Sequence, residues 1–276
     1  MVTDSTAYLP PELTGGITIV PLTVALGGFE GDEGEQVTPT EVAVALAERR
    51  VRVTTSRPPP ERFVRCYRAA LDHGAPGVVS VHLSARLSGT YDAAVLAAAE
   101  VDPERIAVVD AGSTGMALGF CALAAVATAT GGDLAAVRDV AAAAAGRTET
   151  FFYVDTLEFL RRGGRISAAS ALVGTALAVK PILHVQDGAI VVRDRVRTTS
   201  RAIDRLVDLA VTAAGDAEVD LAVHHLAAER RARTVTDALL ARLGSRVRRH
   251  FVSEVGAVVA AHVGPGLAGV VVHRHG

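Results

Sequence analysis

A short loop in the N-terminal third of the chain combines residue types that suit an anion. Ser88, Gly89 and Thr90 stand between an apolar run at residues 78–83 and an Ala-rich segment, so the loop is expected to join a strand to a helix. In an open parallel sheet, ligands bind beyond the carboxyl ends of the strands, where a starting helix directs unpaired N–H groups and partial positive charge. The two hydroxyls add donors, and Gly89 lets a ligand approach the backbone. This pattern favours a bound anion.

The anion predicted at this loop is small and singly charged. The loop holds one cationic side chain, Arg86, and lacks the G-x-x-x-x-G-K-[ST] phosphate cradle, so a carboxylate fits better than a triphosphate. The alternative is that Ser88 or Thr90 only caps the helix, with Asp92 complementing the dipole in its first turn. The loop alone leaves both interpretations open.

Two further segments offer uncharged hydrogen-bonding groups. Thr55 and Ser56 precede a proline run at residues 58–60 and a helix, so they lie at another helix entrance, either as ligand contacts or as caps. His262 lies between an apolar run and a Gly-Pro-Gly segment, where a neutral imidazole can donate a hydrogen bond. A purely structural histidine is the alternative.

Two cationic side chains are also candidates. Arg165 follows two glycines near the expected domain junction, which gives it reach into a cleft; the alternative is an ordinary surface guanidinium. Lys180 is the only lysine among 28 basic residues. It marks a site that needs a compact ammonium, or else it survives by chance in a chain with codon bias toward arginine.

Several classes of function find little support. The chain has no G-x-S-x-G elbow, and Ser88 has no recognisable base nearby in the sequence. His224 and His225 are adjacent on an expected strand and face opposite ways, so no metal site is predicted. A net charge of -2 gives no reason to expect nucleic acid. Two distant cysteines and the lack of a basic, apolar leader favour a cytoplasmic protein.

The order of expected elements predicts an α/β protein with two units. Strands and helices alternate up to an aromatic strand at residues 151–154, as in a doubly wound, mostly parallel sheet. In this half, residues 17–26 are expected to form one strand and residues 29–38 a solvated loop. Beyond the junction, a helix is expected at 168–178, and Asp187-Gly188 between two apolar runs predicts a hairpin. The expected domains are therefore residues 1–157 and a smaller mixed or antiparallel α/β domain at 158–276.

Taken together, these stretches resemble the DegV family of bacterial fatty-acid-binding proteins. The resemblance rests on short blocks that recur in order along nearly the whole chain. They are Asp4-Ser5-Thr6 with Leu9-Pro10, Thr55-Ser56 with Pro58, Leu87-Ser88-Gly89-Thr90-Tyr91, Val109-Asp110, Leu160 with Gly163-Gly164-Arg165-Ile166-Ser167, Lys180-Pro181-Ile182-Leu183, and His262 with Gly264-Pro265-Gly266.

The resemblance implies a DegV-like two-domain fold with a long-chain fatty acid in an apolar tunnel between the domains. It places the carboxylate at Thr55, Ser88, Gly89 and His262. Arg165, Ser56, Thr90 and Lys180 are then expected near the head group or at the encounter with a kinase. The resemblance does not place these four residues at the carboxylate itself.

The resemblance also implies a carrier rather than a catalyst. Family members present the acid to a separate dihydroxyacetone-kinase-like subunit and carry the acyl phosphate, with transient membrane contact allowed and no cofactor or metal. The chain departs from the family at Arg57 and Pro59, where glutamine and serine are common, and at Ala111-Gly112-Ser113. A small-acid phosphotransferase and a lipid-responsive regulator without a kinase partner are the alternatives.

Overall fold

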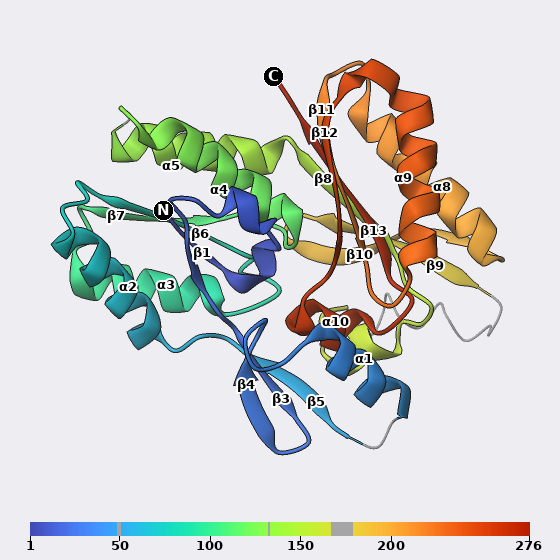
Figure 1. Cartoon of the computed structure of the whole chain (residues 1–276), viewed down its shortest axis with the longest axis horizontal. Helices are drawn as coiled ribbons and strands as arrows, with labels where there is room; N and C mark the ends of the chain where they lie inside the picture. Colours follow the sequence, from blue (N-terminus) through green and yellow to red (C-terminus); the bar gives the residue numbers. More distant parts are fainter. Residues whose placement is uncertain (49–50, 132, 167–178) are drawn as a thin grey trace.

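A parallel four-stranded sheet forms the N-terminal part of the molecule. The computed structural model describes residues 1–48, 51–131, 133–166 and 179–276. The sheet has the strand order β2-β1-β6-β7 and is covered by helices on both faces (Figure 1). Its elements are β1 (Val2–Asp4), β2 (Thr18–Val20), β6 (Val78–His82), β7 (Ile106–Asp110), α2 (Pro60–Asp72) and α3 (Thr90–Val101) on one face, and α4 (Met116–Ala129) and α5 (Leu134–Gly146) on the other.

A buried polar network fixes the end of β6. His82 Nδ1 lies 3.0 Å from Asp4 Oδ2, and His82 Nε2 lies 2.7 Å from Ser80 Oγ. Tyr67 donates its hydroxyl proton to Ser80 Oγ at 2.8 Å. Because all four side chains are fully buried, this Asp–His–Ser arrangement cannot meet a substrate. Asp4 also accepts a hydrogen bond from Leu83 N at 2.9 Å, which anchors the loop that leads to Ser88.

A six-stranded mixed sheet forms most of the C-terminal part, with the order β10-β9-β8-β13-β11-β12. Two long helices, α8 and α9, pack on its outer face (Figure 1). The elements are β8 (Thr148–Tyr153), β9 (Lys180–Gln186), β10 (Ala189–Val196), α8 (Thr199–Ala214), β11 (Val219–His225), α9 (Glu229–Leu243), β12 (Val247–Glu254) and β13 (Ala268–Arg274). The fold class predicted from the sequence is confirmed, although this second sheet has more strands than the first.

The aromatic strand belongs to the second sheet and not to the first. Residues 151–154 were expected to end the first half, but β8 pairs with β13 and β9 in the six-stranded sheet. The reason is that β8 finds its partner about 120 residues further along the chain, which an alternating local pattern cannot reveal. The division into domains at residue 157 stays a prediction.

A small antiparallel sheet, β4-β3-β5, protrudes at one end of the molecule beside α1 (Figure 1). Its strands are β3 (Thr23–Leu26), β4 (Phe29–Asp32) and β5 (Val53–Ser56), and α1 spans Pro39–Glu48. The single strand predicted over residues 17–26 is in fact two strands in different sheets, because Pro21 interrupts the pairing. The loop predicted over residues 29–38 begins with β4, which pairs with β3.

The predicted hairpin at Asp187-Gly188 is confirmed, since β9 and β10 pair antiparallel around it. Both turn residues have positive φ, 49° for Asp187 and 77° for Gly188, as a two-residue hairpin turn requires. The helix predicted over residues 168–178 lies outside the described residues. Two short helices, α6 (Glu158–Arg162) and α10 (Ala257–Val263), complete the set that positions the candidate site.

Candidate functional site

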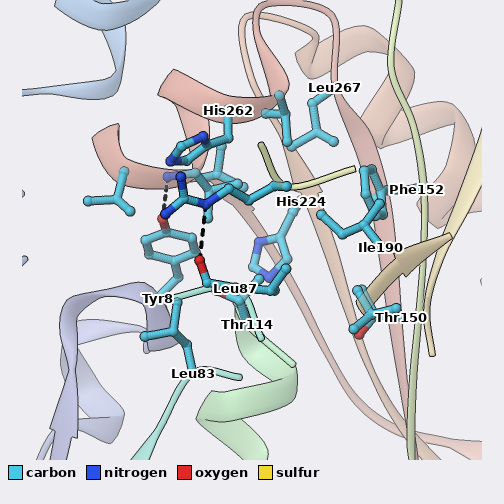
Figure 2. A pocket seen from close by; sticks show the side chains of 18 of the residues that line it. Tyr8, Leu83, Leu87, Thr114, Thr150, Phe152, Ile190, His224, His262 and Leu267 are labelled. Carbon is cyan, nitrogen blue, oxygen red and sulfur yellow. Dashed lines mark hydrogen bonds between the residues drawn. The ribbon is translucent and has the colours of Figure 1, made fainter. Parts of the chain in front are cut away.

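A cavity lies where the three sheets meet α10 (Figure 2). The centres of water molecules can reach about 110 Å³ of it, and the whole space between protein atoms, open solvent included, is about 930 Å³. Most of its wall is aliphatic. The apolar lining residues are Leu22, Leu83, Leu87, Phe152, Leu160, Val185, Ile190, Val255, Val258, Val259, Val263, Leu267, Val270 and Val271.

The polar end of the cavity joins two of the predicted residues directly. Thr55 in β5 and His262 in α10 are 207 positions apart in sequence, yet Thr55 Oγ1 lies 2.8 Å from His262 Nε2. Both side chains line the cavity. A strand of the small sheet and the last turn of α10 therefore form one hydrogen-bonding unit.

His262 is a neutral imidazole at ordinary pH. Burial lowers its pKa to about 4, and the positive charge of Arg165 acts in the same direction. Its Nδ1 atom is buried and has no hydrogen-bond partner among the described residues. Gly163 makes room for the ring, because a Cβ on that glycine would lie 2.3 Å from His262 Nδ1. The imidazole can therefore supply a hydrogen bond here without adding a charge.

Ser88 lines the cavity from the parallel sheet's side, but its hydroxyl also serves the helix start. Ser88 Oγ accepts a hydrogen bond from Thr90 N at 3.3 Å and lies 2.9 Å from Thr90 Oγ1. Thr90 is fully buried and does not line the cavity. The N-cap residue of α3 is Gly89, so the capping alternative holds for neither residue in its simple form. Ser88 combines its local contact with Thr90 N and a position on the cavity wall.

Two guanidinium groups flank Ser88. Arg165 is half-buried and donates from Nε to Leu87 O at 3.0 Å and from Nη1 to Gly163 O at 2.5 Å. Arg57, which is exposed, reaches over Gly89 and lies 3.5 Å from its carbonyl oxygen. Neither arginine has a carboxylate partner within the part of the chain that the structure describes. Both positive charges are therefore available to an anion at this end.

The remaining candidates lie at different distances from this end. Ser56 is on the cavity wall beside Thr55. Gly89 is next to Ser88, but the Arg57 side chain covers the position where a Cβ would point. Lys180 begins β9, pairs with Val196 and does not line the cavity. Ser167, which belongs to the Gly-Gly-Arg block, lies outside the described residues.

A second hollow adjoins the polar end and shares Thr55, Arg165 and His262 with it. It encloses about 960 Å³, part of it open to solvent, and adds Arg52 and Arg162 to its lining. We call it the vestibule. Arg162 also lies 3.7 Å from Glu158, and the described residues that line the vestibule include three arginines and no acidic side chain, so this lining is positively charged. The polar end of the cavity therefore shares part of its wall with a space lined by arginines.

Sequence reasoning missed two residues beside the site. Tyr8 lines the cavity (Figure 2), and its hydroxyl donates to Glu33 Oε1 at 3.1 Å. Glu33 is buried, at 5% exposure, in a stretch that reads as a solvated acidic loop. The sequence holds no signal for Glu33, because its partners are up to 225 positions away.

The described residues contain no group of three or more potential metal ligands close enough to hold an ion. Among the helices that are described, none combines the length and the apolar character needed to cross a bilayer.

The parallel sheet, the mixed sheet and the aliphatic cavity between them define an α/β protein that can enclose an apolar ligand. A family model described as "Uncharacterised protein, DegV family" matches residues 1–275. The chain belongs to the DegV family. A DegV domain-containing protein of Streptomyces coelicolor is 54% identical over 275 residues, which cover 99% of this chain and 97% of the relative.

Solved structures resemble the whole chain. A DegV family protein from Thermus thermophilus, described as binding fatty acid, superposes with a TM-score of 0.92 at 36% identity, covering 99% of this chain and 98% of its own. DegV from Bacillus subtilis, described as a fatty acid binding protein, gives a TM-score of 0.88 at 31% identity, with coverages of 99% and 98%.

Proposed function

We propose that the protein binds one long-chain fatty acid, with its hydrocarbon chain in the cavity and its carboxylate at Thr55, Ser88 and His262. The observation that carries the proposal is the cavity itself, whose wall is mostly aliphatic and which brings together the hydroxyls of Thr55 and Ser88, the His262 imidazole, and two guanidinium groups without a carboxylate partner among the described residues. The similar structures described as fatty-acid binding support the same assignment. Ser56 and Gly89 are adjacent to the proposed carboxylate site.

The energetics fit this ligand class. Each buried CH₂ contributes roughly 0.8 kcal/mol, so an acyl chain supplies most of the binding free energy before ordering costs. The head-group contacts then fix which end of the ligand enters and how deep it lies. Because His262 is neutral, the charge that balances the carboxylate comes from Arg165 and Arg57.

We further propose that the protein presents its ligand to a separate ATP-using kinase subunit and carries the acyl phosphate. The vestibule supports this step, since Arg52, Arg162 and Arg165 suit the extra negative charge of a phosphoryl group. The chain has no phosphate cradle of its own, so the ATP site is assigned to the partner. Cytoplasmic location and transient membrane contact for ligand exchange belong to the same proposal.

Fatty-acid binding is tested by native mass spectrometry of the protein purified from cells, which should show the added mass of one fatty acid. After lipid removal, the Thr55→Ala and Ser88→Ala variants should each bind palmitate about tenfold more weakly, as expected for one lost hydrogen bond to a charged group. Thr14→Ala is the matched control, because that exposed hydroxyl bonds only to Pro11 O. The proposed site would be excluded if the purified protein carried no fatty acid and if neither substitution changed its affinity for palmitate.

The kinase proposal needs a different experiment. Arg165→Ala should retain palmitate binding within a few-fold but slow acyl phosphate formation when the kinase subunit and ATP are supplied. If the isolated chain consumed ATP with a small acid, the phosphotransferase alternative would replace the carrier. If no kinase subunit co-purified from the native host and none accepted the loaded protein, the regulator alternative would stand.

A further inference from the structure

The helix that carries His262 has no cap of its own. α10 is seven residues long and begins after Gly256, which has no side chain to accept a hydrogen bond from the first turn. The cap comes instead from two distant residues. Val258 N donates to Glu33 Oε1 at 2.8 Å, and Val259 N donates to the Tyr8 hydroxyl at 3.3 Å.

Glu33 is the centre of this contact set. Its Oε1 accepts from the Tyr8 hydroxyl as well as from Val258 N, and its Oε2 accepts a short hydrogen bond from Ser5 Oγ. Burial raises the pKa of Glu33, although the hydrogen bonds from Ser5, Val258 and Tyr8 oppose that change. A buried carboxyl group with three donors is well satisfied, and removing it would leave all three unpaired.

The local backbone is shaped to admit Glu33. A Cβ on Gly256 would lie 2.3 Å from Glu33 Oε1 and 2.6 Å from the Tyr8 ring. Glycine at this position lets the carboxyl group approach the first turn of α10 directly. The contact is therefore an integral part of the fold around the cavity rather than a surface ion pair.

Both ends of α10 are held by the same small sheet. Glu33 follows β4 directly and binds the first turn, while Thr55 in β5 binds His262 in the last turn. Val258 and His262 are four residues apart, one helical turn along α10. A shift at the capped end therefore moves the imidazole relative to Thr55 and Ser88.

We propose that Glu33 is a positioning residue, which caps α10 together with Tyr8 and thereby holds His262 where it meets the ligand's carboxylate. This inference rests on the proposed fatty-acid site. It assigns to Glu33 a role in head-group recognition. The sequence around Glu33, an acidic stretch directly after β4, does not suggest such a role.

The test compares palmitate with its methyl ester, which has the same chain but no anionic head. Glu33→Ala should weaken palmitate binding about tenfold, the effect of losing a well-placed polar contact to a charged group. Its affinity for the ester should change by less than about twofold, because α10 contributes only Val258, Val259 and Val263 to an apolar wall that otherwise lies on other segments. Glu33→Gln, which keeps an acceptor oxygen, should restore most of the palmitate affinity, and the His262 imidazole NMR signals should shift in Glu33→Ala only.

Asp133→Ala is the matched control. Asp133 caps α5 by accepting from Ala136 N at 2.7 Å and does not line the cavity, so its loss should lower stability without changing the preference for acid over ester. If Glu33→Ala proves too unstable to purify, Tyr8→Phe removes the second cap and should show the same acid-specific loss.

Equal weakening of acid and ester, or no change of either in a folded Glu33→Ala protein, would overturn the positioning role. If the unmodified protein did not bind palmitate or did not prefer it to the ester, the proposed fatty-acid site would fail instead. The two failures are therefore distinguishable.

Discussion

At the scale of single residues, the position of the His262 ring requires glycine at residue 163, because the two approach too closely for a Cβ. The backbone of Gly163 has φ of -76°, which any residue can adopt, so a substitution here acts through space and not through backbone strain. A Cβ would meet His262 Nδ1 at 2.3 Å and Phe159 O at 3.2 Å. The imidazole would have to leave its place beside Thr55.

Gly163→Ala is therefore expected to weaken palmitate binding about tenfold, as loss of the His262 contact would. Isothermal titration calorimetry on lipid-free protein measures it. Gly146→Ala is the control, because its new Cβ at the end of α5 would meet nothing within 4 Å. Unchanged palmitate affinity in Gly163→Ala would mean that His262 does not touch the ligand.

At the scale of elements, the β9–β10 hairpin ties the two large sheets together and closes the cavity. Ser84 Oγ, in the loop after β6, donates to Gly188 O at 2.7 Å, and Arg86 Nη1 donates to Asp187 O at 2.9 Å. Val185 and Ile190, on either side of the turn, line the cavity. Docking of the turn thus holds one wall in place.

Gly188→Ala should loosen this wall. Alanine is strained at φ of 77°, and its Cβ would lie 2.6 Å from Ser84 Oγ. Strain and the broken contact together should lower the free energy of unfolding by about 2 kcal/mol and speed release of bound acid. Urea titration measures the free energy of unfolding, and stopped-flow displacement measures the rate at which the acid is released. Gly74→Ala shares the positive φ but meets nothing within 4 Å, so it should lose stability without faster release. Equal release rates in both variants would show that docking of the β9–β10 turn does not control release of the acid.

Elements whose signals are local could be predicted from the sequence. The hairpin follows from Asp187-Gly188 alone, and the strand–loop–helix around Ser88 follows from composition and spacing. Pairings between distant segments could not, which is why β8 was placed in the wrong sheet. The same limit applies to the site: Thr55 and His262 were identified by resemblance, whereas Glu33 depends on a hydrogen bond spanning 225 positions.

At the scale of the whole molecule, the cavity lies within the core rather than on the surface. One cluster of buried residues includes Val24 of β3, Val81 of β6, Leu183 of β9 and Val258 of α10, so it joins all three sheets. A ligand in the cavity extends this core. Saturating palmitate should therefore stabilise the fold by mass action as well as fill a site.

The molecule also buries three histidines in the neutral form, two of them, His224 and His262, on the wall of the cavity. Burial lowers the pKa of His262, of His224 and of His273 to about 4 in each case. In the unfolded chain each would titrate near its normal value of about 6.5. Below that pH the unfolded state binds more protons than the folded state. The free energy of unfolding therefore decreases as the pH is lowered, until the pKa of the folded state is reached.

The free energy of unfolding should thus decrease by up to about 1.4 kcal/mol per pH unit for each of these histidines between roughly pH 6.5 and pH 4. Glu33 acts in the opposite direction, because burial raises its pKa and the folded state therefore binds this proton more readily than the unfolded state as the pH is lowered. It is one group against three histidines. Urea titrations of lipid-free protein at pH 7.5 and pH 5 measure the slope, and His273→Asn should reduce it by one histidine's share. His250→Asn, at an exposed position, is the control for the substitution itself. A stability that stayed flat down to pH 5 would mean that these imidazoles reach water more freely than their packing allows.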